Sequence, residues 1–392
     1  MPKRLQHMAQ AGQPGHDFRF FDNREKYLQF VTTTSEKWAI AERIGRDVAQ
    51  LAPEPPALRI FDAGTGDGTV LGRVMRRLHH HFPTVPFLVV GKEVSLEDVR
   101  LTLARLPDRF AEHPQTVVVL TNLYYSQAPW LRPSAKRIDE LNWIEVPLDG
   151  QTVHDYDCQI EALNDVLNEG WQVTTSEKTG NPLYVRPSVL VLYPKQQRYI
   201  LDRIIPRKAE VLDGRDAAYD LVLAAQPYRS RLPAETKVSF VLEPLSRALA
   251  PGGRLIGIQS TGRGPSMEIV QALWPDDDPF PTPRHRLLEA LEQRLGDAAS
   301  DLVFEPLEDA DSLFRYNLRV MASEVGESIG TSTLLAAWNA AIYVAQIPDD
   351  RLRQVLAEGR YVEVTAEVLR RHGGLWFFDE SFVVRRHPEP GR

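Results

Sequence analysis

The sequence predicts a doubly wound α/β fold, in which helices cover a mostly parallel sheet and an α+β lobe is inserted. Three observations predict it. An apolar, strand-like run at 58–63 leads into a glycine-rich loop and then a helical pattern. Further β-branched runs alternate with helical patterns along much of the chain, which is typical of parallel sheets. Residues 129–215 break this alternation and are therefore interpreted as an insertion.

Residues 1–56 are expected to form a helical cover ahead of the first strand. A polar arm, 1–17, comes first. Thr33 and Glu36 have the spacing of a capping box, in which two side chains satisfy the first amides of a helix. The helix that they introduce should end near Leu51, because prolines follow it.

Residues 57–128 should form the first half of the core, and their first loop is its most informative stretch. Asp62 ends the strand, and Gly64, Gly66 and Gly68 follow at alternate positions. Dinucleotide-binding loops instead space their glycines G-x-G-x-x-G, with the pyrophosphate at the helix N-terminus. Carboxylates at Asp62 and Asp67 would also repel phosphate. The loop therefore favours a cationic ligand that carries an amino group and no phosphate.

This stretch resembles motif I of the class I S-adenosylmethionine-dependent methyltransferases, D-x-G-x-G-x-G after the first strand. The resemblance extends over about 35–128 and 216–260. It implies a seven-stranded Rossmann-like core that uses S-adenosyl-L-methionine as its cofactor. It also implies the residues that bind this cofactor: Asp62, Gly64, Thr65, Gly66, Gly68, Glu93, Val94, Asn122 and Leu123.

Two further strands are expected at 85–93 and 115–122. Glu93 ends the first of them, and a carboxylate can accept both hydrogens of a ribose diol, the role that the resemblance also implies. Ser95 is a plausible N-cap of the next helix. Asn122 ends the other strand, where members of the family contact the adenine.

Two groups of residues have a second interpretation. Tyr27, Thr33 and Lys37 could line the cofactor cleft, but capping and surface roles are favoured. The three histidines at 79–81 cannot share one metal ion, because consecutive helical residues point about 100° apart. They indicate a solvated helix end, and no metal site is expected.

The inserted lobe at 129–215 is expected to be a substrate lid or a structural addition. Its polar residues His154, Asp155 and Asp157 are interpreted as a turn rather than as acid–base groups. The lobe should contain strands at 143–148, 171–175 and 183–193, a helix at 160–167 and a turn at 180–182.

Residues 216–392 should complete the core, beginning with a strand that ends near Ala225. In doubly wound folds this strand meets the first one at the ligand cleft. The segment is similar to motif IV of amino-methyltransferases, but Ala225 cannot accept the hydrogen bond that the family's first residue accepts. Gln226 could do so through its amide, with Tyr228 packing on a flat target, and these two are the candidate catalytic residues.

Three other residues are candidates for the methyl-acceptor pocket. Tyr124 and Tyr125 follow the third strand, and Arg263 lies in a glycine-containing loop at 261–264. A turn at 251–253 should precede the fifth strand at 254–259. The sixth strand is expected at 340–347 and an antiparallel seventh at 374–385, with a bulge or turn at 379–380.

Composition limits the other classes of function. The 392 residues carry a formal net charge of −7 and no long basic run, so nucleic acid is not indicated as a partner. No apolar run is long enough to cross a membrane, and the first residues lack a signal core, so the cytoplasm is expected. A single cysteine, Cys158, cannot form an internal disulfide.

The sequence therefore favours a methyltransferase whose acceptor is a small molecule or a protein, with nitrogen slightly preferred as the methylated atom. An aminopropyltransferase, an NAD-dependent dehydrogenase or a non-catalytic binding module on the same fold are the alternatives. The glycine spacing disfavours the dehydrogenase. The sequence predicts neither the acceptor nor the oligomeric state.

Overall fold

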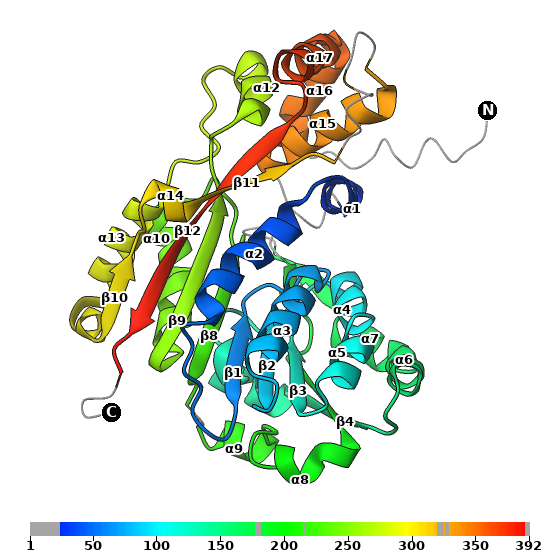
Figure 1. The fold of residues 1–392 in the computed structure, drawn as a ribbon, viewed down its shortest axis with the longest axis vertical. Helices are drawn as coiled ribbons and strands as arrows, with labels where there is room; N and C mark the ends of the chain where they lie inside the picture. The colour runs from blue at the N-terminus through cyan, green and yellow to red at the C-terminus, as the bar shows by residue number, and fades with distance from the viewer. Residues whose placement is uncertain (1–23, 177–181, 215, 320–324, 326–328, 389–392) are drawn as a thin grey trace.

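The computed structural model describes residues 24–176, 182–214, 216–319, 325 and 329–388 (Figure 1). The expected arm at 1–17, the first two residues of the expected turn at 180–182 and the chain end at 389–392 lie outside the described residues.

One mixed sheet organises the described part of the chain and confirms the α/β prediction. Its order is β10-β12-β9-β8-β1-β2-β3-β7-β4, with β11 paired to β12, so it has ten strands rather than the seven predicted. The core strands are β1 (Leu58–Asp62), β2 (Phe87–Lys92), β3 (Thr116–Thr121), β8 (Tyr219–Ala225), β9 (Leu249–Ser260), β10 (Leu302–Glu305) and β12 (Trp376–Arg386). The first five are parallel, and β12 is antiparallel to both β9 and β10.

The strand residues alternate between two hydrophobic layers, because successive side chains of a strand point to opposite faces. On β1, Ile60 faces one layer and Phe61 the other. The first layer includes α2 (Glu36–Val48), α3 (Thr69–His81), α4 (Leu96–Leu103) and α5 (Leu106–Glu112). The second includes α10 (Ala234–Lys237), α11 (Glu243–Arg247) and α13 (Arg284–Leu295). This burial on both faces explains why the central strands β2, β3 and β8 are mostly apolar.

The inserted residues extend the main sheet beyond β3. Strand β7 (Ser188–Pro194) pairs antiparallel with β3, and β4 (Asn142–Leu148) pairs parallel with β7. A separate hairpin joins β5 (Val173–Thr175) to β6 (Pro182–Tyr184). The inserted helices are α6 (Val153–Glu161), α7 (Asn164–Gly170), α8 (Arg198–Leu201) and α9 (Lys208–Leu212). The expected strand at 183–193 is therefore two strands, and the expected helix at 160–167 is divided between α6 and α7.

Helices from the last third of the chain gather at the end of the sheet where β9 points, beside α1 (Arg24–Thr33) (Figure 1). They are α12 (Pro265–Leu273), α15 (Thr331–Val344), α16 (Asp349–Glu358) and α17 (Arg360–His372), and we call this group with α1 the helical cap. The predicted sixth strand at 340–347 was wrong, because most of it belongs to α15. Its apolar residues are buried on all sides, and such a run does not reveal its period. Strand β10 takes the sixth position instead.

Strand β12 confirms the predicted antiparallel seventh strand but not its interruption. Asp379 and Glu380 pair in register with Ser260 and Gln259 of β9, and no turn separates them. Strand β11 (Leu313–Asn317), which follows the short α14 (Asp309–Ser312), covers the other edge of this part of β12. The expected turn at 251–253 also lies within a strand, as an irregularity near the start of β9.

The N-terminal cover consists of two helices, and the expected capping box is absent. Thr33 ends α1, where its hydroxyl donates a hydrogen bond to the Gln29 carbonyl at 2.6 Å. Ser35 is the N-cap of α2. Ser95 caps α4 as predicted, by accepting a hydrogen bond from the Asp98 amide.

Candidate functional site

The glycine-rich loop joins β1 to α3 at the carboxyl edge of the sheet, as predicted. Gly66 and Gly68 have φ of +52° and +74°, in the region that side chains disfavour. A Cβ on Gly68 would also lie 2.8 Å from the Thr102 Cα, whereas one on Gly64 would meet nothing within 4 Å. Two glycines are therefore needed for the loop's shape, and open space remains beside the third.

Asp62 is buried beneath this loop and accepts a hydrogen bond from the Gly64 amide at 3.2 Å. Burial raises the pKa of its carboxyl to about 7, the Gly64 amide opposes the rise, and the negative charge of Glu93 adds to it. Asp62 is therefore an acid that a cationic ligand would hold in its ionised form.

Glu93 closes the loop from the end of β2. Its Oε2 accepts from the Gly66 amide at 2.9 Å, and its Oε1 accepts from the Val94 and Ser95 amides at 2.8 and 2.9 Å. A carboxylate offers about four acceptor positions, so these three bonds leave about one for a ligand. The ribose role stays a prediction, and the structure adds a second role, because Glu93 orders the loop itself.

Asp67 is less available than the sequence suggests. Its carboxylate accepts from the Thr69 amide at 3.2 Å and the Thr69 hydroxyl at 2.5 Å, and it lies 3.3 Å from the Arg105 guanidinium. Arg105 also donates to the Asp67 carbonyl at 2.7 Å. Arg105 therefore partly balances the negative charge of Asp67, which would otherwise repel a phosphate ligand. Asp62 is the stronger reason to expect a cationic ligand.

Side chains of α1 and α2 lie over the loop. The Tyr27 hydroxyl is 3.1 Å from the position that a Cβ on Gly66 would take. The Lys37 ammonium lies 5.7 Å from the centre of the Tyr27 ring and 3.6 Å from the Glu36 carboxylate. Tyr27 therefore lies beside the loop with Lys37 next to it, where the sequence favoured capping and surface roles, whereas Thr33 bonds within its own helix.

Two hydroxyls near this loop are buried and lack a hydrogen-bond partner within the described residues, those of Tyr27 and Thr65. Buried polar atoms are nearly always paired. Together with the space beside Gly64 and the acid at Asp62, they fit a ligand with an ammonium group and further polar atoms. The loop residues present therefore suit S-adenosylmethionine, which carries such groups.

Asn122 follows β3, and its side chain bonds to residues of the insertion. Its side-chain oxygen accepts from the Ser188 amide at 2.8 Å, and its nitrogen donates to the carbonyls of Gly170 and Arg186 at 3.0 and 2.9 Å. Leu123 is buried in the second hydrophobic layer, and Val94 is buried beside Glu93. The predicted adenine contacts of Asn122 and Leu123 remain predictions.

Gln226 follows β8 in a left-handed backbone conformation, with φ of +53°. A non-glycine residue there costs about 1–3 kcal/mol. Its side-chain nitrogen donates to the Ser260 hydroxyl at 2.8 Å, and its oxygen accepts from the Ser260 amide at 3.3 Å. The strained backbone therefore holds the Gln226 amide against the end of β9.

Tyr228, the other candidate catalytic residue, has different neighbours. It is buried in the second hydrophobic layer, its hydroxyl has no hydrogen-bond partner within the described residues, and burial raises its pKa. The Lys237 ammonium lies 5.0 Å from its ring. Burial lowers the pKa of Lys237 to about 8, against the opposing charge of Glu380.

The candidate acceptor residues are dispersed. The Tyr125 hydroxyl donates to the Pro227 carbonyl at 2.7 Å, linking the loops after β3 and β8. The half-exposed Tyr124 ring packs on Tyr184, with 4.6 Å between ring centres. Arg263 is exposed and pairs with Asp309 at 2.9 Å.

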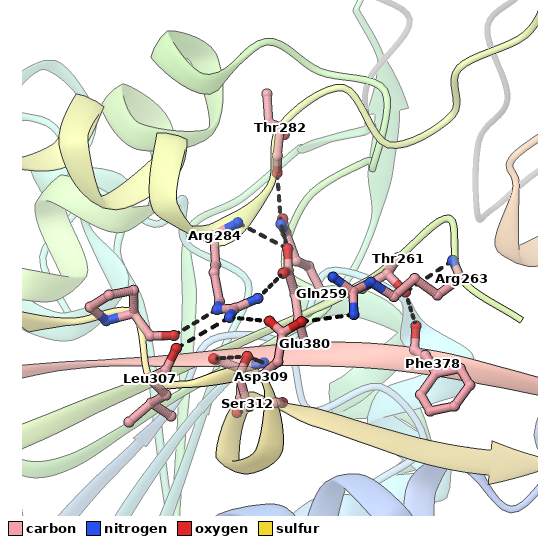
Figure 2. Close-up of polar contacts among 12 residues, drawn as sticks. Gln259, Thr261, Arg263, Thr282, Arg284, Leu307, Asp309, Ser312, Phe378 and Glu380 are labelled. Atoms are coloured by element: carbon pink, nitrogen blue, oxygen red, sulfur yellow. Dashed lines mark hydrogen bonds and ion pairs between the residues drawn. The ribbon is translucent and has the colours of Figure 1, made fainter.

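Sequence reasoning missed the acids on β12. Glu380 accepts from Gln259 at 2.7 Å and from the Arg284 amide and guanidinium at 2.9 and 3.0 Å (Figure 2). Asp379, on the other face of the strand, is fully buried, and neither of its oxygens has a hydrogen-bond partner within the described residues. The sequence did contain one signal for these residues, because two adjacent acids inside a mostly apolar strand are unusual.

In the described part of the chain, no helix is long and apolar enough to cross a membrane. Among the same residues, no group of three or more His, Cys, Asp or Glu side chains could hold a metal ion.

No family model and no curated protein matches the sequence. The solved structures that are similar to this chain include the following three. Geranyl diphosphate methyltransferase in complex with SAM is 12% identical over 96% of this chain and 93% of that chain, with a TM-score of 0.32. The plantazolicin methyltransferase BpumL in complex with SAH is 9% identical over 93% and 91%, with a TM-score of 0.33. The [4+2]-cyclase SpnF is 12% identical over 88% and 81%, with a TM-score of 0.32.

Proposed function

We propose that the protein is a class I S-adenosylmethionine-dependent methyltransferase that acts on a small molecule or a protein, with nitrogen favoured as the methylated atom. The observation that carries the proposal is the acidic loop after β1, at the carboxyl edge of the parallel strands. Open α/β sheets bind ligands at this edge. The sheet order, with β1 central between β2 and β8 and an antiparallel β12, agrees with the core that the sequence resemblance implies.

In this proposal the loop from Asp62 to Gly68 holds the amino-acid end of the cofactor and Glu93 holds the ribose. The bound cofactor supplies an activated methyl group on a positively charged sulfur. The protein then contributes alignment and exclusion of water. Tyr27 and Lys37 from the helical cover shield the loop, and the amide of Gln226 orients the acceptor near the end of β9. Tyr124, Tyr125, Tyr228 and Arg263 are the remaining candidates for acceptor contacts.

Isothermal titration calorimetry tests the proposal. S-adenosylmethionine and S-adenosylhomocysteine should both bind, and NAD should not. Binding of NAD without either sulfur nucleoside would reject the proposal. Tight cofactor binding with no labelled product from a cell extract supplied with methyl-labelled cofactor would favour a non-catalytic binding module. Transfer of an aminopropyl group would indicate the alternative transferase.

Cofactor affinity should also depend on pH through Asp62. The raised pKa of about 7 means that the carboxyl is largely protonated below neutral pH, when it cannot pair with the ligand's ammonium group. Affinity should therefore increase between pH 6 and pH 8, by at most about tenfold per unit below the pKa. Titrations of the Asp62→Asn variant across this range provide the control, since ligand ionisation affects both proteins. Parallel pH curves for the two proteins would contradict the role of Asp62.

A further inference from the structure

Asp379 is a buried acid that the fold leaves unpaired. Its exposed fraction is 0%, and neither oxygen has a hydrogen-bond partner within the described residues. Burying a carboxyl without partners is unfavourable, so such groups are rare and need a specific explanation.

The next residue shows that the fold can pair an acid on this strand. Glu380 faces the opposite side of β12 and receives Gln259 and Arg284 (Figure 2). These partners satisfy Glu380 in the same strand, at the same depth. The difference between the two acids therefore comes from the side of β12 that each one faces, and Asp379 faces α2.

The neighbours of Asp379 on that face are polar and include a second acid. Ser260 is its partner on β9, with Gln226 hydrogen-bonded to Ser260. Burial raises the pKa of Asp379 well above its ordinary value, and the negative charge of Glu36 on α2 adds to the rise. Three groups lower the pKa of Asp379: the side chains of Ser260 and Gln226, which lie near enough to act as hydrogen-bonding groups although neither makes a bond of ordinary geometry, and the positive charge of Lys37.

Two other groups complete these surroundings. Tyr316 of β11 lies close enough for the charge of Asp379 to raise the pKa of its buried phenol, and the Tyr316 hydroxyl has no hydrogen bond of ordinary geometry. Further along the strand, Ser381 accepts a hydrogen bond from Arg43, whose guanidinium pairs with Asp47 at 2.5 Å. Arg43 is therefore bound to Ser381 and Asp47, and it does not neutralise Asp379.

The acid lies at the same edge of the sheet as the cofactor loop. Strands β1, β8, β9 and β12 are successive neighbours. Asp62 pairs with Leu223 on β8, which pairs with Ile256 on β9, and Asp379 pairs with Ser260, two residues past the last β8–β9 pair. Three strand spacings of about 4.8 Å, or about 14 Å, separate β1 from β12 across the sheet, and Ser260 lies four residues, or about 13 Å, beyond Ile256 along β9. The positive charge of Lys37 acts on both Asp62 and Asp379, so the two acids share an electrostatic neighbour.

We propose that Asp379 binds the methyl acceptor and takes its proton, and that the acceptor is an amine. This inference rests on the proposed methyltransferase function. A bound ammonium group would first give one N–H proton to a carboxylate oxygen of Asp379. The nitrogen lone pair freed in this way would then form a bond to the methyl carbon, while the carbon–sulfur bond breaks with its electron pair on sulfur. An amine suits the site because Asp379 and Glu36 together favour a cationic guest, and an ammonium group can donate hydrogen bonds to the carboxylate of Asp379.

Asp379→Asn is the central test, because it keeps the shape and removes the base. Asp220→Asn is the matched control. Asp220 lies at the other end of β8, where it accepts a hydrogen bond from the Arg59 amide and burial raises its pKa to about 6. Methyl transfer should fall about 100-fold or more in Asp379→Asn, the range of a lost general base, and stay near the wild-type rate in Asp220→Asn. Both variants should bind S-adenosylhomocysteine with a dissociation constant within about twofold of the wild-type value.

Thermal unfolding gives a readout that does not depend on activity. Because the pKa of Asp379 is higher in the folded protein than in the unfolded chain, the folded state holds the proton more tightly. Its contribution to stability is therefore greatest at acid pH and is lost as the pH rises through the folded value. Asp379→Asn should raise the Tm at pH 8 relative to wild type and change it less at pH 5. A lower Tm at pH 8 would mean that Asp379 is a structural residue and would overturn the proposal.

The site of the label and the pH profile complete the test. With methyl-labelled cofactor and a cell extract, mass spectrometry should find the label on nitrogen, and label on oxygen, sulfur or carbon would overturn the amine assignment. Glu36→Gln should move the acidic limb of kcat/KM to lower pH, since it removes a charge that raises the pKa of Asp379. An Asp379→Asn enzyme as active as wild type would refute the role of Asp379 alone, whereas failure of the wild-type protein to bind either sulfur nucleoside would refute the methyltransferase function itself.

Discussion

Replacing Gly66 with valine should weaken binding of S-adenosylhomocysteine by about 100-fold, or about 2.7 kcal/mol. Gly66 has φ of +52°, and a Cβ there would lie 3.1 Å from the Tyr27 hydroxyl. A β-branched residue is strongly disfavoured in that backbone region, and its methyl groups would project toward Tyr27 and the proposed ligand. The amide that Gly66 donates to Glu93 would also be displaced. Calorimetry with the purified variant measures the loss.

Gly72→Ala provides the control for that experiment. Gly72 lies within α3, has no positive φ, and a Cβ there would meet nothing within 4 Å. Alanine in a helix interior is favoured over glycine by about 1 kcal/mol, so this variant should bind normally and unfold at a slightly higher temperature. Unchanged affinity in a folded Gly66→Val protein would show that the ligand does not use this loop.

The largest expected effect on stability is that of Gly257→Ala. Gly257 of β9 pairs with Phe382 of β12, and the Phe382 ring covers the glycine so closely that a Cβ would lie 2.1 Å from its Cζ. Both residues are buried. The ring has no exposed space to enter, so the substitution should cost about 3 kcal/mol of unfolding free energy, the upper end of ordinary overpacking. Urea denaturation monitored by circular dichroism measures this cost.

A double-mutant cycle with Phe382→Leu identifies the cause. If the clash with the ring is responsible, Gly257→Ala should cost less in the Phe382→Leu background than in the wild-type protein, because leucine lacks the ring edge. An equal cost in both backgrounds would attribute the effect to the β9 backbone instead.

Local patterns were enough to predict the elements that depend on neighbouring residues in the chain. The loop after β1 follows from an acid and alternate glycines, which constrain the backbone wherever they occur. The apolar run at 340–347 was assigned to a strand for the opposite reason. It is buried on every side within the helical cap, so it has no polar face to reveal a period of two or 3.6.

The site residues also differ in whether their partners are close in the sequence or distant from them. Glu93 was found because acids at strand ends face the ligand edge, and its bonds to the Gly66, Val94 and Ser95 amides lie within or beside the predicted loop. Asn122 occupies the corresponding position on β3, but its partners come from the insertion, about 50–65 residues later in the chain. No local pattern could have revealed that commitment.

By itself, the sequence determined that the chain forms an α/β sheet with a glycine-rich acidic loop at its ligand edge, because those features are encoded by residues close together. Only the tertiary structure decided which acids are paired. Glu380 and Asp379 are adjacent in sequence, yet Arg284 pairs with Glu380, whereas no described side chain makes a hydrogen bond of ordinary geometry to Asp379. Side chains alternate across a strand, so two neighbouring acids face different layers of the protein, and the packing of distant helices settles which one is neutralised.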